Sequence, residues 1–401
     1  MKNEILLFIL LICVLNACRK TEEPSVPPLP CAGVAAKTNR LAPTWNLPKG
    51  PSSSMYPVAF ENQVIFSRLL PLGEVEVLGF NGTSGQLLWQ SAVPAYLTDK
   101  RYRQIGSKLY FADRSRTSLL SFDLATQKLE TVWMVPAPAT MSFYFAVQEG
   151  FVICPVVQDL ASDSVAISAH LVNLQSGASR EVLRFHTLIA DHNGSGILDP
   201  KVTITPAGDT VFCFVRVEYQ QPFTLFARFS SWNISTHAVH ESDIWLDNYY
   251  KEQNHLIVEG QYAWFLAGDR LQCTNVSTGA MVWTAINSDF TRWQLLVKQG
   301  KIVVSGNGIT AFDAENGTAL WSHPINNRSG DLRSSFLQAG QLFLIHAHRL
   351  ISVDFETGCL TGDHALPADF DDALANMTLA PDGESIYLLG VKNFYAVPLP
   401  E

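Results

Sequence analysis

The sequence predicts an all-β fold made of a repeated unit of four short strands, and three observations support this prediction. Short apolar runs alternate with Gly, Asn, Asp and Pro along the chain, and helical periodicity is scarce. One phrase recurs, as FNGTSGQLLW at 80–89 and FDAENGTALW at 312–321. The glycines Gly279, Gly317 and Gly358 of three copies are 38 and 41 residues apart, a spacing that fits four short strands per unit.

The recurring phrase reads as a β-hairpin. Residues 308–312 form an apolar strand that enters a polar turn, where Gly317 can adopt a positive φ without steric cost. Residues 319–321 then begin the next strand. The same turn is expected at five glycines, Gly85, Gly177, Gly279, Gly317 and Gly358. The phrase is degenerate at 122–133 and at 232–240.

A second, preceding hairpin allows the units to be counted. A turn followed by an apolar strand occurs eight times, at 61–66, 106–111, 149–153, 207–212, 259–264, 299–304, 339–344 and 382–387. The eighth unit ends at Glu401 without an outer strand, and residues 42–48 resemble the outer strand at 89–94. We therefore predict a β-propeller of eight four-stranded blades, closed by an N-terminal strand that completes the last blade. Seven blades is the alternative if the long third or fourth unit is misread.

The phrase A/V-x-D/N-x-x-T/N-G-x-x-x-W resembles the repeat of PQQ-like β-propellers, over about residues 38–401. That family includes quinoprotein alcohol dehydrogenases and BamB-type outer-membrane lipoproteins. In the family the Trp packs between neighbouring blades, so the resemblance implies a structural role for the matching tryptophans. Trp89, Trp283 and Trp321 match the phrase directly, and Trp45 and Trp133 match it by position.

The N-terminus resembles a bacterial lipoprotein signal. The apolar run 5–15 is too short to span a bilayer but suits a signal peptide, and small residues precede Cys18 as in a lipobox. We predict that residues 1–17 are a signal peptide and that Cys18 is lipidated, with an ordinary secretory signal as the alternative. Arg19 favours the outer membrane over the inner one, at its periplasmic face or the cell surface.

Two segments follow the lipidation site. Residues 18–37 are rich in proline and are expected to form a flexible tether, and residues 38–401 are expected to form the propeller. We expect the protein to contact the membrane only through the lipid on Cys18.

Composition bounds the function. The chain has 401 residues, of which 47% are hydrophobic and 16% charged, so it can bury a large core. Its net charge of −9 argues against a nucleic-acid partner. The five cysteines that follow Cys18 form no CxxC motif and no adjacent pair, which argues against a zinc knuckle. Cys154 and Cys213 lie in apolar strands and are expected to be buried thiols; a bridge between them is the open alternative.

One loop resembles part of a calcium-binding loop. Asp191, Asn193, Ser195 and Asp199 offer oxygen ligands at the expected spacing, but the twelfth position is Val202 rather than an acidic residue. A polar loop between blades is the alternative. His346 and His348 are expected on one strand face, where a chance pair is favoured over a metal site.

These features favour a non-enzymatic, monomeric scaffold that binds protein partners in the cell envelope, with a role in envelope assembly as one version. Insertions at 158–167 and 220–248 add aromatic residues that suit an interface. One alternative is a surface carbohydrate-binding protein or hydrolase of a nutrient-uptake system. The other is a quinone-dependent dehydrogenase, which the absence of adjacent cysteines argues against. We expect no cofactor: calcium is a candidate only at the loop above, and PQQ is not expected.

Overall fold

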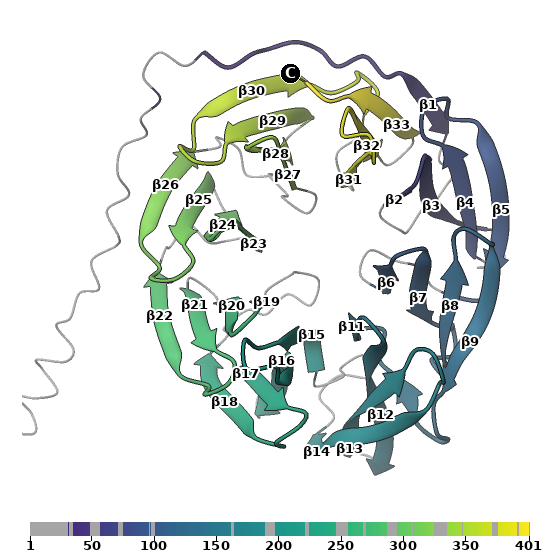
Figure 1. Cartoon of the computed structure of the whole chain (residues 1–401), viewed down its shortest axis with the longest axis vertical. Helices are drawn as coiled ribbons and strands as arrows, with labels where there is room; N and C mark the ends of the chain where they lie inside the picture. The colour runs from purple at the N-terminus through teal and green to yellow at the C-terminus, as the bar shows by residue number, and fades with distance from the viewer. Residues whose placement is uncertain are drawn as a thin grey trace, which may run out of the picture.

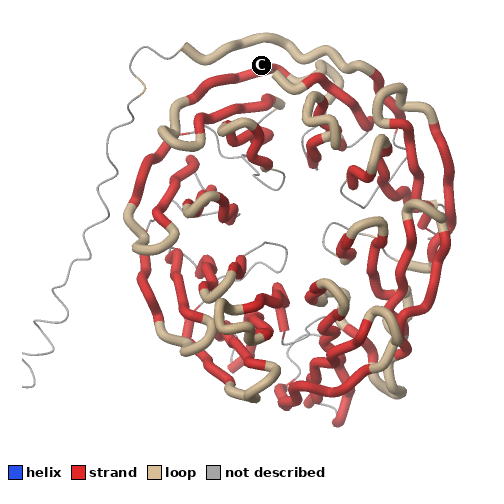
Figure 2. Tube along the Cα trace, viewed as in Figure 1, coloured by secondary structure: helices blue, strands red, loops and turns tan. Residues whose placement is uncertain are grey.

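The computed structural model is a ring of β-sheets (Figure 1). It describes residues 31, 35–48, 57–70, 75–95, 97, 101–161, 164–188, 197–220, 224–245, 256–267, 270–286, 295–305, 308–324, 335–346, 348–370, 376–390 and 393–400. These residues form strands and loops (Figure 2), and they include no helix long and apolar enough to cross a membrane. Eight antiparallel sheets are formed, which confirms the predicted eight-bladed propeller and excludes seven blades.

The first four blades follow the chain from the axis of the ring outward. Blade 1 consists of β2 (Val58–Phe60), β3 (Gln63–Leu69), β4 (Val75–Asn81) and β5 (Leu87–Val93). Blade 2 consists of β6 (Tyr102–Ile105), β7 (Lys108–Ala112), β8 (Ser118–Asp123) and β9 (Lys128–Met134). Blade 3 consists of β10 (Thr140–Met141), β11 (Ala146–Gln148), β12 (Phe151–Ala161), β13 (Ser164–Asn173) and β14 (Ser179–Leu188). Blade 4 consists of β15 (Ile197–Ile204), β16 (Thr210–Gln220), β17 (Thr224–Asn233) and β18 (Val239–Trp245).

The last four blades repeat this order. Blade 5 consists of β19 (Leu256–Glu259), β20 (Tyr262–Ala267), β21 (Arg270–Asn275) and β22 (Met281–Ile286). Blade 6 consists of β23 (Leu295–Lys298), β24 (Lys301–Ser305), β25 (Gly308–Asp313) and β26 (Ala319–Pro324). Blade 7 consists of β27 (Phe336–Gln338), β28 (Gln341–His346), β29 (Arg349–Asp354) and β30 (Leu360–Ala365). Blade 8 consists of β31 (Asn376–Leu379), β32 (Ser385–Leu389), β33 (Asn393–Pro398) and the N-terminal strand β1 (Trp45–Pro48).

The middle strands of the blades explain the continuous apolar runs in the sequence. In β25, for example, four consecutive residues are buried, because each sheet packs on a neighbouring blade through both faces. The described residues form eight apolar clusters, each of which draws on two adjacent blades. Between blades 4 and 5, for instance, Phe229 and Phe265 stack with ring centroids 5.4 Å apart.

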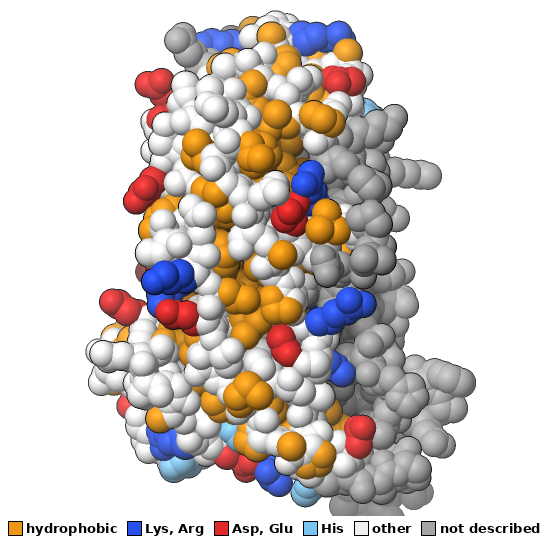
Figure 3. All heavy atoms as spheres, turned by 90° about the vertical axis from the view of Figure 1, so that its right-hand side faces the viewer, with side chains coloured by type: hydrophobic (Ala, Val, Ile, Leu, Met, Phe, Trp, Pro, Cys, Tyr) orange, Lys and Arg blue, Asp and Glu red, His pale blue; other side chains and the backbone are white. Residues whose placement is uncertain are grey.

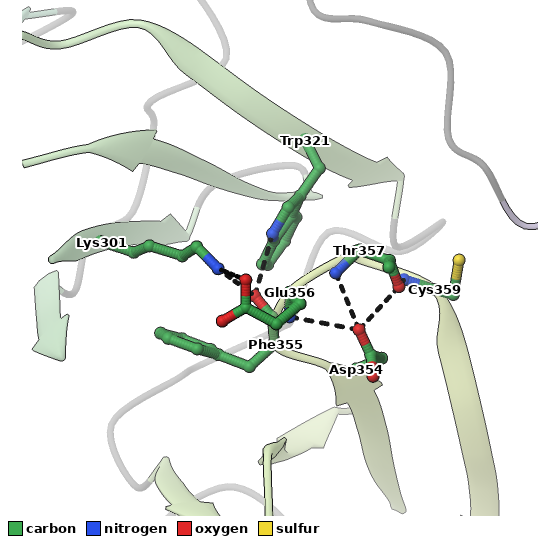
Figure 4. Close-up of polar contacts among 7 residues, drawn as sticks. All are labelled: Lys301, Trp321, Asp354, Phe355, Glu356, Thr357 and Cys359. Carbon is green, nitrogen blue, oxygen red and sulfur yellow. Dashed lines mark hydrogen bonds and ion pairs between the residues drawn. The ribbon is translucent and has the colours of Figure 1, made fainter. Parts of the chain in front are cut away.

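An Asn or Asp at the end of the third strand organises each repeated turn. The Asp354 Oδ1 accepts hydrogen bonds from the Glu356 and Thr357 backbone N–H groups, at 3.1 and 2.7 Å (Figure 4). This side chain satisfies backbone donors that the turn leaves unpaired. The equivalent residues in six other blades make the same pair of bonds: Asn81, Asp123, Asn173, Asn233, Asn275 and Asp313.

The turn glycine that follows makes room for a tryptophan of the preceding blade. A Cβ at Gly358 would lie 2.5 Å from the Trp321 ring, and the Trp321 Nε1–H donates to the Phe355 carbonyl at 3.2 Å (Figure 4). Trp283 packs in the same way on Gly317, and Trp45 packs on Gly85. All five predicted turn glycines have a positive φ: Gly85, Gly177, Gly279, Gly317 and Gly358.

Two of the five tryptophans are placed differently. Trp133 is buried and donates from Nε1 to the Ser179 Oγ of blade 3 at 3.0 Å. Trp89 contacts Phe122 of blade 2, with ring centroids 5.8 Å apart, but its Nε1–H donates to the Gln63 Oε1 of its own blade at 2.7 Å. The turn of blade 2, on which Trp89 would dock, carries Gln127 with φ 58° in place of a glycine. In other blades a Cβ at this turn position would lie within 3 Å of the docked ring, so Gln127 does not leave the room that a glycine leaves.

The N-terminal segment closes the ring and also covers blade 7. Strand β1 pairs antiparallel with β33, as predicted from the missing outer strand. Before it, residues 35–41, here called the strap, run beside β30 (Figure 1), with isolated parallel bridges Lys37↔Gly362 and Arg40↔Ala365. A disulfide joins Cys31 to Cys359 in the turn that precedes β30. Chain contacts with the propeller therefore extend into the segment predicted to be a tether.

The other cysteines of the described residues are free. Cys154, Cys213 and Cys273 are buried at three different blade interfaces, so the bridge considered between Cys154 and Cys213 is not formed. Burial raises the pKa of the Cys273 thiol to about 12 and also raises the pKa of the other two. All three thiols are therefore expected to be unreactive in the folded chain.

Truncation of Trp321 tests the packing between blades. Trp321→Ala is expected to lower the free energy of unfolding by roughly 3–5 kcal/mol, since a buried ring and its hydrogen bond are lost. Met134→Ala, on an exposed outer position, is the control and should change stability by no more than about 0.5 kcal/mol. Urea unfolding followed by circular dichroism measures both values. Equal midpoints for the two variants would contradict the packing role.

Thiol counting after unfolding tests the disulfide pairing. In a chain lacking residues 1–30, the native protein should react with a thiol reagent at none of its cysteines. Unfolding without reductant should expose Cys154, Cys213 and Cys273. The variant Cys31→Ser should expose these three and Cys359, four in all, because its partner is gone. A Cys154–Cys213 bridge would instead leave only Cys273 and Cys359 reactive in that variant.

Candidate functional site

Exposed apolar side chains gather on the rim of the propeller. Seven of the eight large apolar residues that are exposed among the described residues lie on outermost strands of blades: Leu87, Leu88, Leu129, Met134, Val239, Met281 and Val282. Figure 3 views the rim over β5 and β9, where apolar side chains form a band between charged groups. We call these seven residues the apolar rim. Exposed apolar bands of this kind mark contact surfaces more often than scattered single residues do.

Blade 7 shows how one outermost strand is covered. Leu360 lies two residues after its turn glycine, the position that Leu87 and Met281 hold in blades 1 and 5. Leu360 is half-buried, whereas Leu87 and Met281 are 44% and 58% exposed. Next to Leu360, the Lys37 backbone N–H of the strap donates to the Thr361 carbonyl at 2.9 Å. An extended segment thus pairs with the edge of an outermost strand.

A second surface feature lies where blades 2 and 3 meet. Arg101, just before β6, lies over the Phe143 ring with its Cζ 4.3 Å from the ring centroid. The Arg116 Cζ, in the turn between β7 and β8, is 5.5 Å from the same centroid. The Arg103 Cζ is 6.0 Å from the centroid of Phe145. We call these five residues the arginine–phenylalanine cluster; each contact has the geometry of a cation–π interaction.

The backbone fixes the position of Arg116. Its carbonyl accepts a hydrogen bond from the Met141 N–H of blade 3 at 2.8 Å, and its φ is 61°. A positive φ is unfavourable for a residue with a Cβ, and such conformations collect at functional sites. The turn therefore holds the guanidinium at the boundary between the two blades.

Among the residues that the structure describes, positive charge exceeds negative charge around this cluster. The Asp113 carboxylate is engaged by its own turn, accepting from the Thr117 and Ser118 N–H groups at 2.8 and 2.9 Å. Within the described part of the chain, neither Arg101 nor Arg116 has a carboxylate in ion-pair contact. This local excess stands out in a chain whose net charge is −9.

Deeper in the ring, Asp199 lies near two cations. It sits on β15 with φ 45°, at a shift in the pairing of β15 with β16, and is 8% exposed. Burial lowers the pKa of both Arg103 and Lys201, and the Asp199 carboxylate opposes this effect in each case. The Arg103 charge further lowers the pKa of Lys201. Blades 2 and 4 thus bring charged groups together near the inner strands.

The predicted calcium loop falls only partly within the described residues. Asp191, Asn193 and Ser195 lie outside them, and Asp199 lies close enough to Arg103 and Lys201 for its charge to act on both. Two neighbouring cations oppose the binding of a third positive charge at this carboxylate. Among the described residues, no three His, Cys, Asp or Glu side chains gather as metal ligands would.

The remaining predicted features either lie in the strands and turns of the blades or fall outside the described residues. Cys18 is outside it. His346 ends β28 and His348 lies in the following turn, so the prediction of one shared strand face was wrong: a hairpin, with a positive φ at His348, intervenes. The insertions at 158–167 and 220–248 include long strands, β12, β13 and β16 to β18, in which Trp232 is part of the core.

Sequence reasoning missed the apolar rim and the arginine–phenylalanine cluster. Two adjacent apolar residues before the tryptophan, Leu87-Leu88 in β5 and Met281-Val282 in β22, are the sequence signal for the rim. The cluster has a weaker signal, the spacing of Arg101, Arg103 and Arg116 in one unit. Its aromatic partners come from the next blade, which the sequence alone does not place.

Comparison with known proteins agrees with this architecture. The family model described as outer membrane protein assembly factor BamB matches residues 241–399. The crystal structure of BamB from Moraxella catarrhalis is similar with a TM-score of 0.55 and 14% identity, over 90% of this chain and 100% of that one. None of the curated proteins matches the sequence.

Solved structures with other activities share the fold. A europium-containing methanol dehydrogenase has a TM-score of 0.58 and 10% identity, over 90% of this chain and 93% of that one. An oligogalacturonate lyase in complex with manganese has a TM-score of 0.50 and 14% identity, over 94% and 98%. At these identities the likeness concerns the fold alone. The matched region contains strands β19 to β33, so the last part of the propeller is similar in sequence to the BamB family model, and the solved structures add likeness of fold over most of the chain.

Proposed function

We propose that this chain is a lipid-anchored, non-enzymatic scaffold that binds a protein partner at the bacterial outer membrane. The apolar rim carries the proposal. Its members Leu88, Met134 and Met281 are 48%, 61% and 58% exposed on the outside of the ring, whereas the apolar clusters between blades are buried. Contact with a protein removes such side chains from water, at about 25 cal/mol per Å² of apolar surface buried.

The pairing of the strap with blade 7 is evidence that the outermost strands of the propeller can bind extended segments. It pairs with the edge of β30 by backbone hydrogen bonds that do not depend on its side chains, such as Leu41 N–H to the Ala365 carbonyl at 2.8 Å. Adding a strand to a sheet edge is a common way to bind a peptide. The edge of β5, beside Leu87 and Leu88, offers a partner the same kind of backbone donors and acceptors.

The proposed lipid anchor and the disulfide together limit how far the propeller can lie from the membrane. Cys18 precedes Cys31 by 13 residues (31 − 18), and Cys31 is bonded to blade 7. An extended chain spans at most about 3.3–3.6 Å per residue, so lipidated Cys18 would keep the rim of blade 7 within about 45 Å of the membrane. The match to the BamB family model supports a partner in the assembly of the envelope.

The proposal includes no cofactor. The resemblance to quinone-dependent propellers implies an adjacent pair of cysteines beside the quinone, and no two cysteines are adjacent in this sequence. Cys154, Cys213 and Cys273 are buried at separate interfaces, and Asp199 lies near two cations. These residues do not fit PQQ with calcium, and the similarity to the methanol dehydrogenase supports the fold only.

Crosslinking in living cells tests the scaffold. The tagged wild-type chain should capture a specific envelope protein, and Leu88→Glu should reduce the yield about tenfold or more, because a charge in a desolvated contact costs 2 kcal/mol or more. Gln90→Glu adds the same charge to an exposed position of the same strand and should leave the yield unchanged. Mass spectrometry of the captured proteins gives the yields.

A variant without the lipidation site separates the effect of membrane attachment from the effect of partner binding. Cys18→Ser should abolish capture in cells while the purified protein keeps its fold. Failure of the wild-type chain to capture any protein above an untagged control would overturn the scaffold proposal. Equal capture by Leu88→Glu and Gln90→Glu would place the contact elsewhere than on the rim.

A further inference from the structure

The arginine–phenylalanine cluster has the chemistry of a carboxylate-binding site. A guanidinium presents N–H donors in one plane, which match the two oxygens of a carboxylate. Arg101 lies over the Phe143 ring, and this packing orders its plane without using its donors. Arg116 approaches the same ring from a second element, so two guanidiniums from different turns converge.

The local charge favours an anionic partner. Among the described residues, Arg101, Arg103 and Arg116 lie together, Lys201 lies near Arg103, and the carboxylates beside them are those of Asp113 and Asp199. Asp113 is bound by the amides of its turn, and Asp199 lies toward Arg103 and Lys201. Positive charge thus remains in excess at the outer pair, Arg101 and Arg116, whose mutual repulsion an incoming anion would relieve.

We propose that Arg101 and Arg116, ordered by Phe143, bind the carboxylates of an acidic segment of the protein partner. This inference rests on the proposed scaffold function and names the chemistry of the partner. An acidic peptide fits better than an acidic sugar, because a sugar ring stacks on an open aromatic face and Arg101 covers a face of Phe143. The contact is at the junction of blades 2 and 3, whereas the apolar rim follows the outermost strands.

Direct binding of an acidic peptide tests this site. The probe is fluorescein-labelled hexaglutamate, added to the purified full mature chain in detergent at low salt, with fluorescence anisotropy as the readout. The variant Arg101→Gln with Arg116→Gln should weaken binding about tenfold or more, since charge-assisted bidentate contacts are lost. Affinity should also fall as salt is raised.

A matched control removes the same charge elsewhere. Lys128→Gln with Arg180→Gln also deletes two exposed cations, and its affinity should stay within about twofold of the wild type. Arg101→Lys keeps the charge but loses the planar donors, so it should weaken binding even if the double variant does not fold. Thermal unfolding checks the fold of every variant.

The outcomes separate this inference from the scaffold proposal. Absence of hexaglutamate binding by the wild type, or equal binding by the double variant and the control, would overturn the inference. Capture of a partner by the wild-type chain in cells would still stand as evidence for the scaffold. Tighter binding of oligogalacturonate than of hexaglutamate, lost in the same double variant, would also overturn the inference and assign the site to an acidic glycan.

Discussion

Closure of the ring is the constraint on which the rest of this structure depends. Each blade buries both faces against its neighbours, so the loss of one blade would expose two apolar faces. The chain closes the ring by pairing β1 with β33, in the register Trp45↔Ala396. Trp45 also donates from Nε1 to the Gly82 carbonyl of blade 1 at 3.0 Å. One residue thus links the two ends of the chain to the first blade.

Much of the fold could be predicted because its signals are local. An apolar run, an Asn or Asp, and a glycine within a few residues specify each hairpin, and counting hairpins gives the blades. The features that could not be predicted depend on residues that are distant in sequence. Trp89 bonds to Gln63 of its own blade, and the turn of the next blade has Gln127 where other turns have a glycine. Cys31 pairs with Cys359 across a sequence separation of 328, which no spacing rule indicates.

The candidate sites lie where the repeats differ from one another. Turn glycines and docked tryptophans recur because every interface needs the same packing. The apolar pairs Leu87-Leu88 and Met281-Val282 occur in only some blades, and the arginine–phenylalanine cluster lies at the junction of blades 2 and 3. The periodic residues therefore report the architecture, while residues that depart from the period carry information about binding. Repeated residues can therefore be recognised from the sequence, whereas these binding candidates have no repeat that would reveal them.

The disulfide between Cys31 and Cys359 has a mechanical consequence. Any tension that reaches the folded chain from its N-terminal side arrives first at Cys31, before the strap and before β1. A covalent bond then transmits the load to the turn before β30, in the interior of the sequence. The hydrogen bonds between β1 and β33, which alone complete blade 8, carry none of that force. A pull on the N-terminal side of Cys31 would therefore not open the ring at the pairing of β1 with β33.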